Sequence, residues 1–161
     1  MMLLSGGQSG VDRAALDVAV ALGLDYGGWC PTGGWAEDFP KPPGILAKYP
    51  KLKETPLADP AQRTEWNVRD ADACLILGDG EGLQASRGTA LAQEHAHRYR
   101  KPLLIVDLRD AHNLSRAALW LRVQQARVGD DLKLSIGGPR ESEAPGICAR
   151  ASSFLSALFD D

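Results

Sequence analysis

The chain of 161 residues has little of what marks secreted, membrane-spanning or metal-stapled proteins. It contains only three cysteines, Cys30, Cys74 and Cys148, and their spacing suggests no pairs. This argues against a disulfide scaffold and a zinc ribbon, and it favours a reducing cytoplasm. No apolar run reaches the roughly 18–20 residues that a membrane span needs. The first residues lack a basic region, so we expect no secretory signal.

An excess of positive charge is also missing. The sequence has 18 Lys and Arg against 21 Asp and Glu, a net charge of −3, and no basic block. We therefore expect no nucleic-acid partner and no membrane partner. Among the three histidines, His95 and His97 lie two residues apart in a predicted helix and point to different faces, so we predict no metal site.

The composition that remains is typical of one soluble globular domain, here residues 1–161. Hydrophobic residues make up 44% of the chain and charged residues 24%. Short apolar runs alternate with stretches of helical periodicity. We predict strands near residues 2–4, 26–29, 52–54, 73–77, 103–106 and 132–136, and helices near 11–22, 61–70, 89–100 and 113–128. A last helix should have Pro145 in its first turn and end near Phe159.

This alternation predicts the α/β class, with a parallel sheet flanked by helices on both faces. The strands are nearly continuous apolar runs, as expected for strands that are buried on both sides. Most prolines lie between residues 31 and 60, so that stretch should be mostly loop. The order of the strands cannot be read from the sequence.

Three glycine-rich segments follow predicted strands and should meet at the carboxyl edge of the sheet, where such folds bind ligands. They are residues 5–10, 78–89 and 137–142. The first two lead into helices, whose N-termini and free backbone N–H groups attract anions, phosphate above all. Each segment alone could be a simple turn or cap. The first matches neither the dinucleotide fingerprint nor the P-loop, and it lacks the lysine of an ATPase.

We interpret these segments as phosphate-binding loops for a small phosphorylated ligand. The first would cradle phosphate through backbone N–H groups, the second would add hydroxyl donors and an arginine clamp, and Arg140 would supply charge. Asp12 and Arg13 lie in the first helical turn; Asp12 could instead cap the helix, and Arg13 could form a salt bridge. The predicted binding residues are Gly6, Gly7, Gln8, Ser9, Gly10, Asp12, Arg13, Ser86, Arg87, Gly88, Thr89 and Arg140.

Other polar and aromatic residues near these loops have several interpretations. Glu37 and Asp38 could face the non-phosphate end of the ligand or simply be solvated. If the protein is an enzyme, Asp12, Glu37 or Asp38 would be its general base. Trp29 and Trp35 could stack on a planar ring, and Cys30 is either a functional thiol or core filler. One helical face, formed by Arg63, Thr64 and Asn67, should hold the proline-rich loop by hydrogen bonds.

Several of these segments together resemble the molybdenum cofactor (Moco) carrier family. They are SGGQSGVDRAALD (5–17), GGWCP (27–31), AED (36–38), RTEWNV (63–68), SRGTAL (86–91), KP (101–102) and GPRES (138–142). The resemblance spans nearly the whole chain. It implies a three-layer Rossmann-like fold of the nucleotide-sensing group that includes the lonely-guy nucleotide hydrolases. It also implies molybdenum cofactor (molybdopterin), a phosphorylated pterin, as the ligand and a molybdoenzyme as the recipient.

The chain departs from the hydrolases at the positions that matter for turnover. These enzymes carry paired glutamates shortly after the Gly-Thr step, where this chain has Leu91 and Ala92. We therefore predict a cytoplasmic carrier rather than an enzyme. The alternative is a nucleotide-binding sensor or nucleotide-derivative hydrolase, and assembly into a homo-oligomer stays open. We also expect Gly7→Val to abolish ligand binding with little loss of fold.

Overall fold

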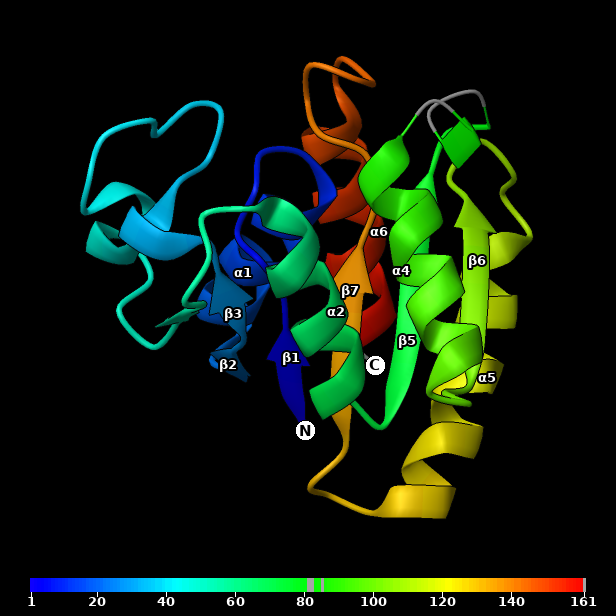
Figure 1. The fold of residues 1–161 in the computed structure, drawn as a ribbon. Coiled ribbons are helices and arrows are strands. Elements are labelled where there is room, and N and C mark those ends of the chain that lie inside the picture. Colours follow the sequence, from blue (N-terminus) through cyan, green and yellow to red (C-terminus); the bar gives the residue numbers. More distant parts are fainter. Residues whose placement is uncertain (81–82, 85, 161) are drawn as a thin grey trace.

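The computed structural model describes residues 1–80, 83–84 and 86–160, and its centre is a five-stranded parallel sheet (Figure 1). The strands follow one another across the sheet in the order β2 (Asp25–Gly27), β1 (Met2–Leu4), β7 (Lys133–Gly137), β5 (Ala73–Gly78) and β6 (Leu103–Asp107). The last strand of the chain therefore lies between the first strand and β5. This insertion brings the third glycine-rich segment beside the other two.

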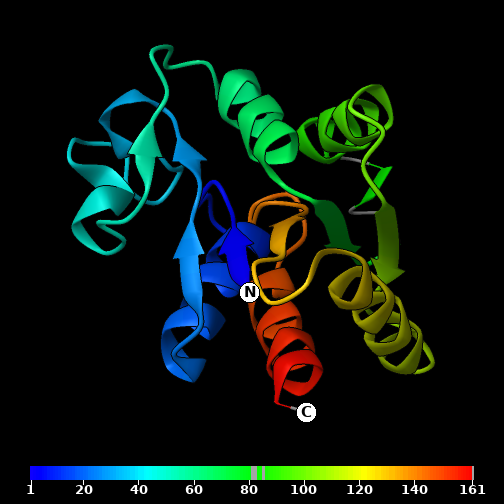
Figure 2. The same ribbon diagram turned by 90° about the horizontal axis from the view of Figure 1, so that it is seen from below.

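Helices cover both faces of the sheet, as the alternating pattern predicted (Figure 2). One face packs against α1 (Val11–Leu22), α5 (Asn113–Val128) and α6 (Ile147–Phe159). The other face packs against α2 (Pro60–Asp70) and α4 (Arg87–Arg98), which also pack against each other. The protein thus has the predicted three-layer, Rossmann-like α/β architecture.

The core runs along the central strands. All six residues of β5 are buried, and Leu3, Leu77 and Leu134 are fully buried. A central strand covered on both faces must be apolar on both, which explains why its sequence shows no alternation. Within the described ranges, no helix combines the length and apolar character that a bilayer crossing requires.

The strand predicted near residues 26–29 is two strands, because Gly28 breaks it. Gly28 has φ +123°, and a Cβ there would lie 2.5 Å from the Ser5 carbonyl oxygen. After this turn the chain leaves the main sheet as β3 (Trp29–Cys30), which pairs in parallel with β4 (Lys53–Glu54). Between them the chain forms only two short 3₁₀ turns, at Thr32–Gly34 and Gly44–Ala47. The proline-rich stretch is therefore mostly loop, as predicted.

The last helix begins two residues later than predicted. Pro145 lies in the turn before α6, and Gly146 follows it with φ +83°. Glu141 caps the start of the helix: its carboxylate accepts hydrogen bonds from the backbone N–H groups of Gly146 (2.5 Å) and Cys148 (3.0 Å). This side-chain cap from the preceding turn replaces the first-turn proline that the sequence suggested.

Candidate functional site

A cleft of about 310 Å³ opens at the carboxyl edge of the sheet, on the face covered by α2 and α4. The ends of β1 and β7, one face of α2 and the N-terminus of α4 form its walls. All three glycine-rich segments reach this edge, but they contribute unequally. The polar residues and glycines of the cleft are Ser5, Gly6, Asp12, Asp59, Arg63, Thr64, Asn67, Ser86, Arg87, Gly88, Thr89, Ser135, Gly137, Gly138, Arg140 and Glu143.

The N-terminus of α4 is the part of the cleft best prepared for an anion. Ser86 caps the helix, because its Oγ accepts a hydrogen bond from the Thr89 N–H (3.2 Å). Thr89 is 2% exposed, and its Oγ1 has no hydrogen-bond partner among the described residues. A Cβ on Gly88 would meet no atom within 4 Å, so a ligand can approach the backbone there. The first backbone N–H groups of a helix have no partner within the helix and carry partial positive charge.

Three arginines line the cleft. Arg63, from α2, donates through Nη1 to Asp12 Oδ2 (2.5 Å), and its buried Nε has no partner in the described part of the chain. Arg87 is exposed at the start of α4. The guanidinium of Arg140 stacks over the Trp35 ring, with 5.6 Å between Cζ and the ring centroid, and it forms no ion pair with a described residue.

The carboxylates of the cleft are already engaged. Asp12 pairs with Arg63, and Asp59 caps α2 by accepting from the Ala61 N–H (2.9 Å). Glu143 accepts from the Arg140 N–H (2.9 Å) and from Ser86 Oγ (3.3 Å). The side chains that keep unused hydrogen-bonding capacity in the cleft are therefore mostly cationic or hydroxyl donors. This donor set fits a phosphate or another small anion.

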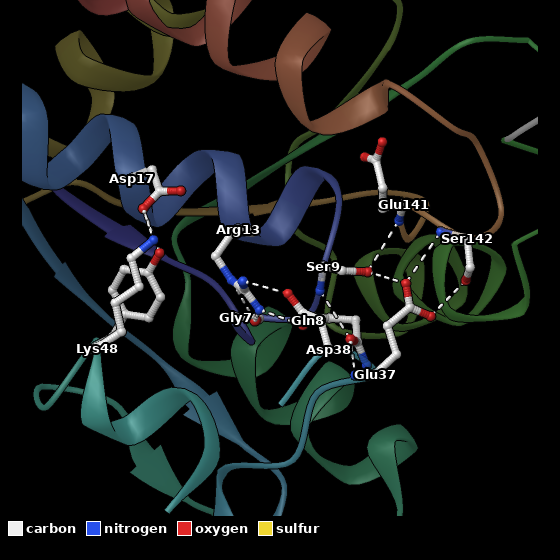
Figure 3. A network of polar contacts seen from close by, with 11 residues as sticks. Gly7, Gln8, Ser9, Arg13, Asp17, Glu37, Asp38, Lys48, Glu141 and Ser142 are labelled. Atoms are coloured by element: carbon white, nitrogen blue, oxygen red, sulfur yellow. Dashed lines mark hydrogen bonds and ion pairs between the residues drawn. The ribbon is translucent and has the colours of Figure 1, made fainter. Parts of the chain in front are cut away.

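The first glycine-rich segment is placed differently from the prediction. Gly6 lines the cleft, whereas Gly7, Gln8, Ser9 and Gly10 are buried and do not. Gln8 Oε1 accepts from the backbone N–H groups of Ser9 (3.0 Å) and Glu37 (2.9 Å) (Figure 3). The segment therefore binds other parts of the protein, and the ligand contacts predicted for these four residues stay predictions.

The first turn of α1 also binds other parts of the protein. The first N–H of the helix, at Val11, donates to the Pro139 carbonyl (3.2 Å). Arg13 forms a two-point ion pair with Asp38 (2.8 and 2.9 Å) and also donates to the Gly7 carbonyl (Figure 3). Of the two alternatives for Arg13, the structure contains the salt bridge.

Outside the cleft, Glu37 links its own loop to the two segments that contain Ser9 and Ser142. Its carboxylate accepts from the Ser9 hydroxyl and from both the N–H (3.2 Å) and the hydroxyl (2.6 Å) of Ser142 (Figure 3). Partial burial opposes ionisation of Glu37, but the hydrogen bonds from Ser142 and Ser9 outweigh it and lower its pKa. Burial likewise opposes ionisation of Asp38, and its ion pair with Arg13 lowers its pKa instead.

These contacts leave none of the three predicted candidates, Asp12, Glu37 and Asp38, in the state that a general base requires. Glu37 and Asp38 do not line the cleft, and the low pKa of each makes it a weak proton acceptor. Asp12 does line the cleft, but it is paired with Arg63. Leu91 and Ala92 also line the cleft, so apolar side chains face it at the positions where the resemblance places the glutamates of the hydrolases.

The α2 face predicted to hold the proline-rich loop instead binds β3, the strand that precedes that loop, through Asn67. Asn67 brackets Trp29 of β3, accepting from its N–H (2.8 Å) and donating to its carbonyl (2.9 Å). Thr64 donates to Pro60 in its own helix (3.1 Å), and Arg63 reaches across to Asp12. Sequence reasoning assigned Arg63 to loop support and missed it as a cleft residue. The only signal in the sequence was that Arg63 lies one helical turn before Asn67. Its ion-pair partner, Asp12, lies 51 residues away in the sequence.

The cysteines fit structural roles. Burial raises the pKa of Cys30 to about 11 and that of Cys74, at the base of the cleft, to about 12. Both thiols are therefore protonated at neutral pH, which favours core filler for Cys30. In the ranges that the structure describes, no group of three or more His, Cys, Asp and Glu side chains is arranged to hold a metal ion.

The expectation that Gly7→Val leaves the fold intact is wrong. Gly7 has φ +69°, a conformation that β-branched residues avoid. A Cβ there would lie 2.4 Å from Cδ1 of the fully buried Ile45. The substitution would therefore perturb the core and could not separate binding from folding.

Comparison with known proteins agrees with the resemblance in the sequence. No curated protein matches the chain. A solved structure from Syntrophus aciditrophicus SB, named "Putative molybdenum carrier protein", is 35% identical, with a TM-score of 0.82 over 98% of this chain and 94% of that one. Residues 3–159 match the sequence model of the circularly permutated YpsA SLOG family. Because that match spans nearly all of the chain, the protein belongs to the circularly permutated YpsA SLOG family.

Proposed function

We propose that this protein is a carrier that binds a small phosphorylated ligand in the cleft between α2 and α4, with molybdenum cofactor as the candidate ligand. The observation that carries the proposal is the imbalance within the cleft. Its carboxylates are engaged, whereas Thr89 Oγ1, the guanidinium of Arg140 and the start of α4 keep unused donors. The carrier role is supported by the name of the similar structure.

The phosphate would sit at the N-terminus of α4. Gly88 lets it approach the backbone, the Thr89 hydroxyl adds a donor, and Arg140 and Arg87 neutralise its charge. The pterin and its metal would be cargo, and their redox chemistry would be used by a recipient molybdoenzyme. The volume of the cleft lies at the lower end of the range of small-molecule sites, so part of the ligand would extend beyond it.

The state of these carboxylates supports binding without turnover. Asp12, Glu37 and Asp38 each have a strong protein partner, and Leu91 and Ala92 replace the glutamates of the related hydrolases. A nucleotide offers the same phosphate group to the start of α4, so a nucleotide-binding sensor is the competing function that the experiment must separate from the carrier.

Native mass spectrometry of protein purified anaerobically from its own host tests the proposal. We expect a bound mass that matches a molybdenum-bearing pterin, and we expect Arg140→Ala to lose it. Arg98→Ala is the matched control, because Arg98 is exposed at the far end of α4 and does not line the cleft. A nucleotide mass in place of the pterin, or an adduct that survives in Arg140→Ala, would contradict the proposal.

A further inference from the structure

A second hollow, of about 360 Å³, lies beside the cleft, and its walls are mainly apolar. We call it the proline groove; it is lined by Thr32, Gly33, Trp35, Pro40, Pro42, Ala58 and Pro60. Pro60, the first residue of α2, lines both the proline groove and the cleft. The two hollows are therefore neighbours across the start of α2.

Arg140 provides a second connection between them. Its side chain lines the cleft, and its guanidinium carbon lies 5.6 Å from the centroid of the Trp35 ring in the groove wall. A ligand whose phosphate pairs with Arg140 would thus have Trp35 within reach of its other end. Charge in the cleft and apolar surface in the groove match a molecule that is anionic at one end and flat and apolar at the other.

The two tryptophans near this edge, Trp29 and Trp35, differ in the contacts that their rings already make within the protein. Trp29 packs edge-on against Trp66, with 4.7 Å between ring centroids, and its indole N–H donates to Asp70 (2.7 Å). Trp35 is half-buried, contacts only Arg140 as a ring partner, and its indole N–H has no partner in the described part of the chain. Of the two, Trp35 is therefore the one with surface available for a ligand.

Two polar groups of the proline groove, the Thr32 hydroxyl and the Gly33 N–H, are used inside the protein. The Thr32 hydroxyl donates to the Thr55 carbonyl (2.5 Å), and the Gly33 N–H donates to Glu54 (2.6 Å). Apart from the indole N–H of Trp35, the groove therefore offers mainly ring and proline faces rather than donors and acceptors that could read the edge of a base. Such a surface holds a planar ring by stacking and discriminates weakly between ring types.

We infer that the proline groove is the ring subsite of the ligand-binding site, with Trp35 as the stacking platform for a bicyclic heteroaromatic ring of the pterin or purine class. This inference rests on the proposed function, because the phosphate of the same molecule occupies the start of α4. The inference adds two statements to the proposed function. The ligand's ring strengthens binding by stacking its face on Trp35, and pterin and purine rings bind with similar affinity.

Calorimetric titration with three probes tests the inference. The probes are ribose 5-phosphate, guanosine monophosphate and neopterin monophosphate. In the native protein we expect the two ring-bearing probes to bind about tenfold more tightly than ribose 5-phosphate, within the range of one base stacked on an aromatic side chain. Trp35→Ala should remove this advantage and leave the affinity for ribose 5-phosphate unchanged, and Trp35→Phe should keep most of it.

Tryptophan fluorescence supplies a readout that a purely structural role would not change. Both ring-bearing probes should quench the native protein, and the quench should be lost in Trp35→Phe although calorimetry still detects binding. Trp120→Phe is the control, because Trp120 lies in α5 on the opposite face of the sheet.

The outcomes separate the two proposals. Equal affinity of the three probes, or an equal loss for all three in Trp35→Ala, overturns the ring subsite and leaves the phosphate site standing. A preference of more than about tenfold for one ring over the other overturns the claim that binding is through the ring face. Failure of all three probes to bind overturns the phosphate site and the ring subsite together.

Discussion

Two glycine turns that lead into helices look alike in the sequence and differ in the structure. Residues 5–10 precede α1, and Ser86 to Gly88 form the start of α4. Gly7 and Gly10 are buried, and a Cβ on Gly10 would lie 2.3 Å from the Pro139 carbonyl oxygen. Gly88 is exposed, and a Cβ there would meet nothing within 4 Å.

The difference shows that a glycine at the start of a helix can be present for either of two physical reasons. At Gly7 and Gly10 a side chain would collide with the protein itself, so glycine is required for packing. At Gly88 no protein atom excludes a side chain, and glycine instead costs helix stability relative to alanine. A glycine that packing does not require is the better marker of close approach by a ligand.

The largest effect should come from the first turn. Gly10→Ala places a Cβ against the Pro139 carbonyl at φ +81°, and we expect a loss of about 3 kcal/mol in unfolding free energy from overpacking and backbone strain. Urea denaturation monitored by circular dichroism measures it. A variant as stable as the native protein would show that this turn is not a packing element.

Arg140→Ala should have the next largest effect, on binding rather than on stability. Loss of a charged hydrogen bond to phosphate corresponds to about 1.5–3 kcal/mol, or roughly 10–100-fold in affinity. Calorimetry with neopterin monophosphate measures it, and the difference from the native protein should shrink at high salt. Arg98→Ala should bind as the native protein does; equal losses in both variants would mean that only net charge matters.

Gly88→Ala tests the start of α4 directly. Because the methyl group meets no protein atom, we expect stability to stay the same or to rise by up to about 1 kcal/mol. The same methyl group would keep phosphate away from the backbone, and we expect about tenfold weaker binding, equivalent to roughly one hydrogen bond. Undiminished affinity would remove the start of α4 from the binding site.

The smallest effect should be the pH dependence that Glu37 contributes. Its pKa is lower in the folded protein, so its stabilising contribution is present above its ordinary pKa of 4.5 and is lost as the pH falls through the folded value. Glu37→Gln should therefore flatten the fall in stability below about pH 4.5. Urea titrations of the native protein and Glu37→Gln at pH 7 and pH 3.5 measure this, with the exposed Glu94→Gln as control. An identical fall in unfolding free energy between the two pH values in all three proteins would contradict it.

Local patterns were enough to predict most elements. The helix at 11–22 has the predicted bounds, and the strand predicted at 73–77 extends by one residue to Gly78. These predictions succeeded because helical periodicity and long apolar runs are properties of neighbouring residues. The break at Gly28 was missed because it depends on a contact with Ser5 in another segment. The late start of α6 was missed because it depends on a side-chain cap from Glu141 that the apolar pattern does not reveal.

The candidate site was predictable in its location and less so in its contents. Seven of the predicted ligand contacts line the cleft: Gly6, Asp12, Ser86, Arg87, Gly88, Thr89 and Arg140. Arg63, Gly138 and Glu143 line it too and were not predicted to. Glu143 is placed by Ser86 and Arg140, and no spacing rule links residues 57 positions apart.

The sequence by itself determined the α/β class, the parallel sheet and the edge at which glycine-rich loops gather, because alternating apolar runs and helices permit few other arrangements. Only the tertiary structure decided which glycine turn remains accessible. The position of β7 between β1 and β5 brings Pro139 onto the first turn of α1, more than 120 residues away. That contact covers the first turn and leaves the start of α4 open.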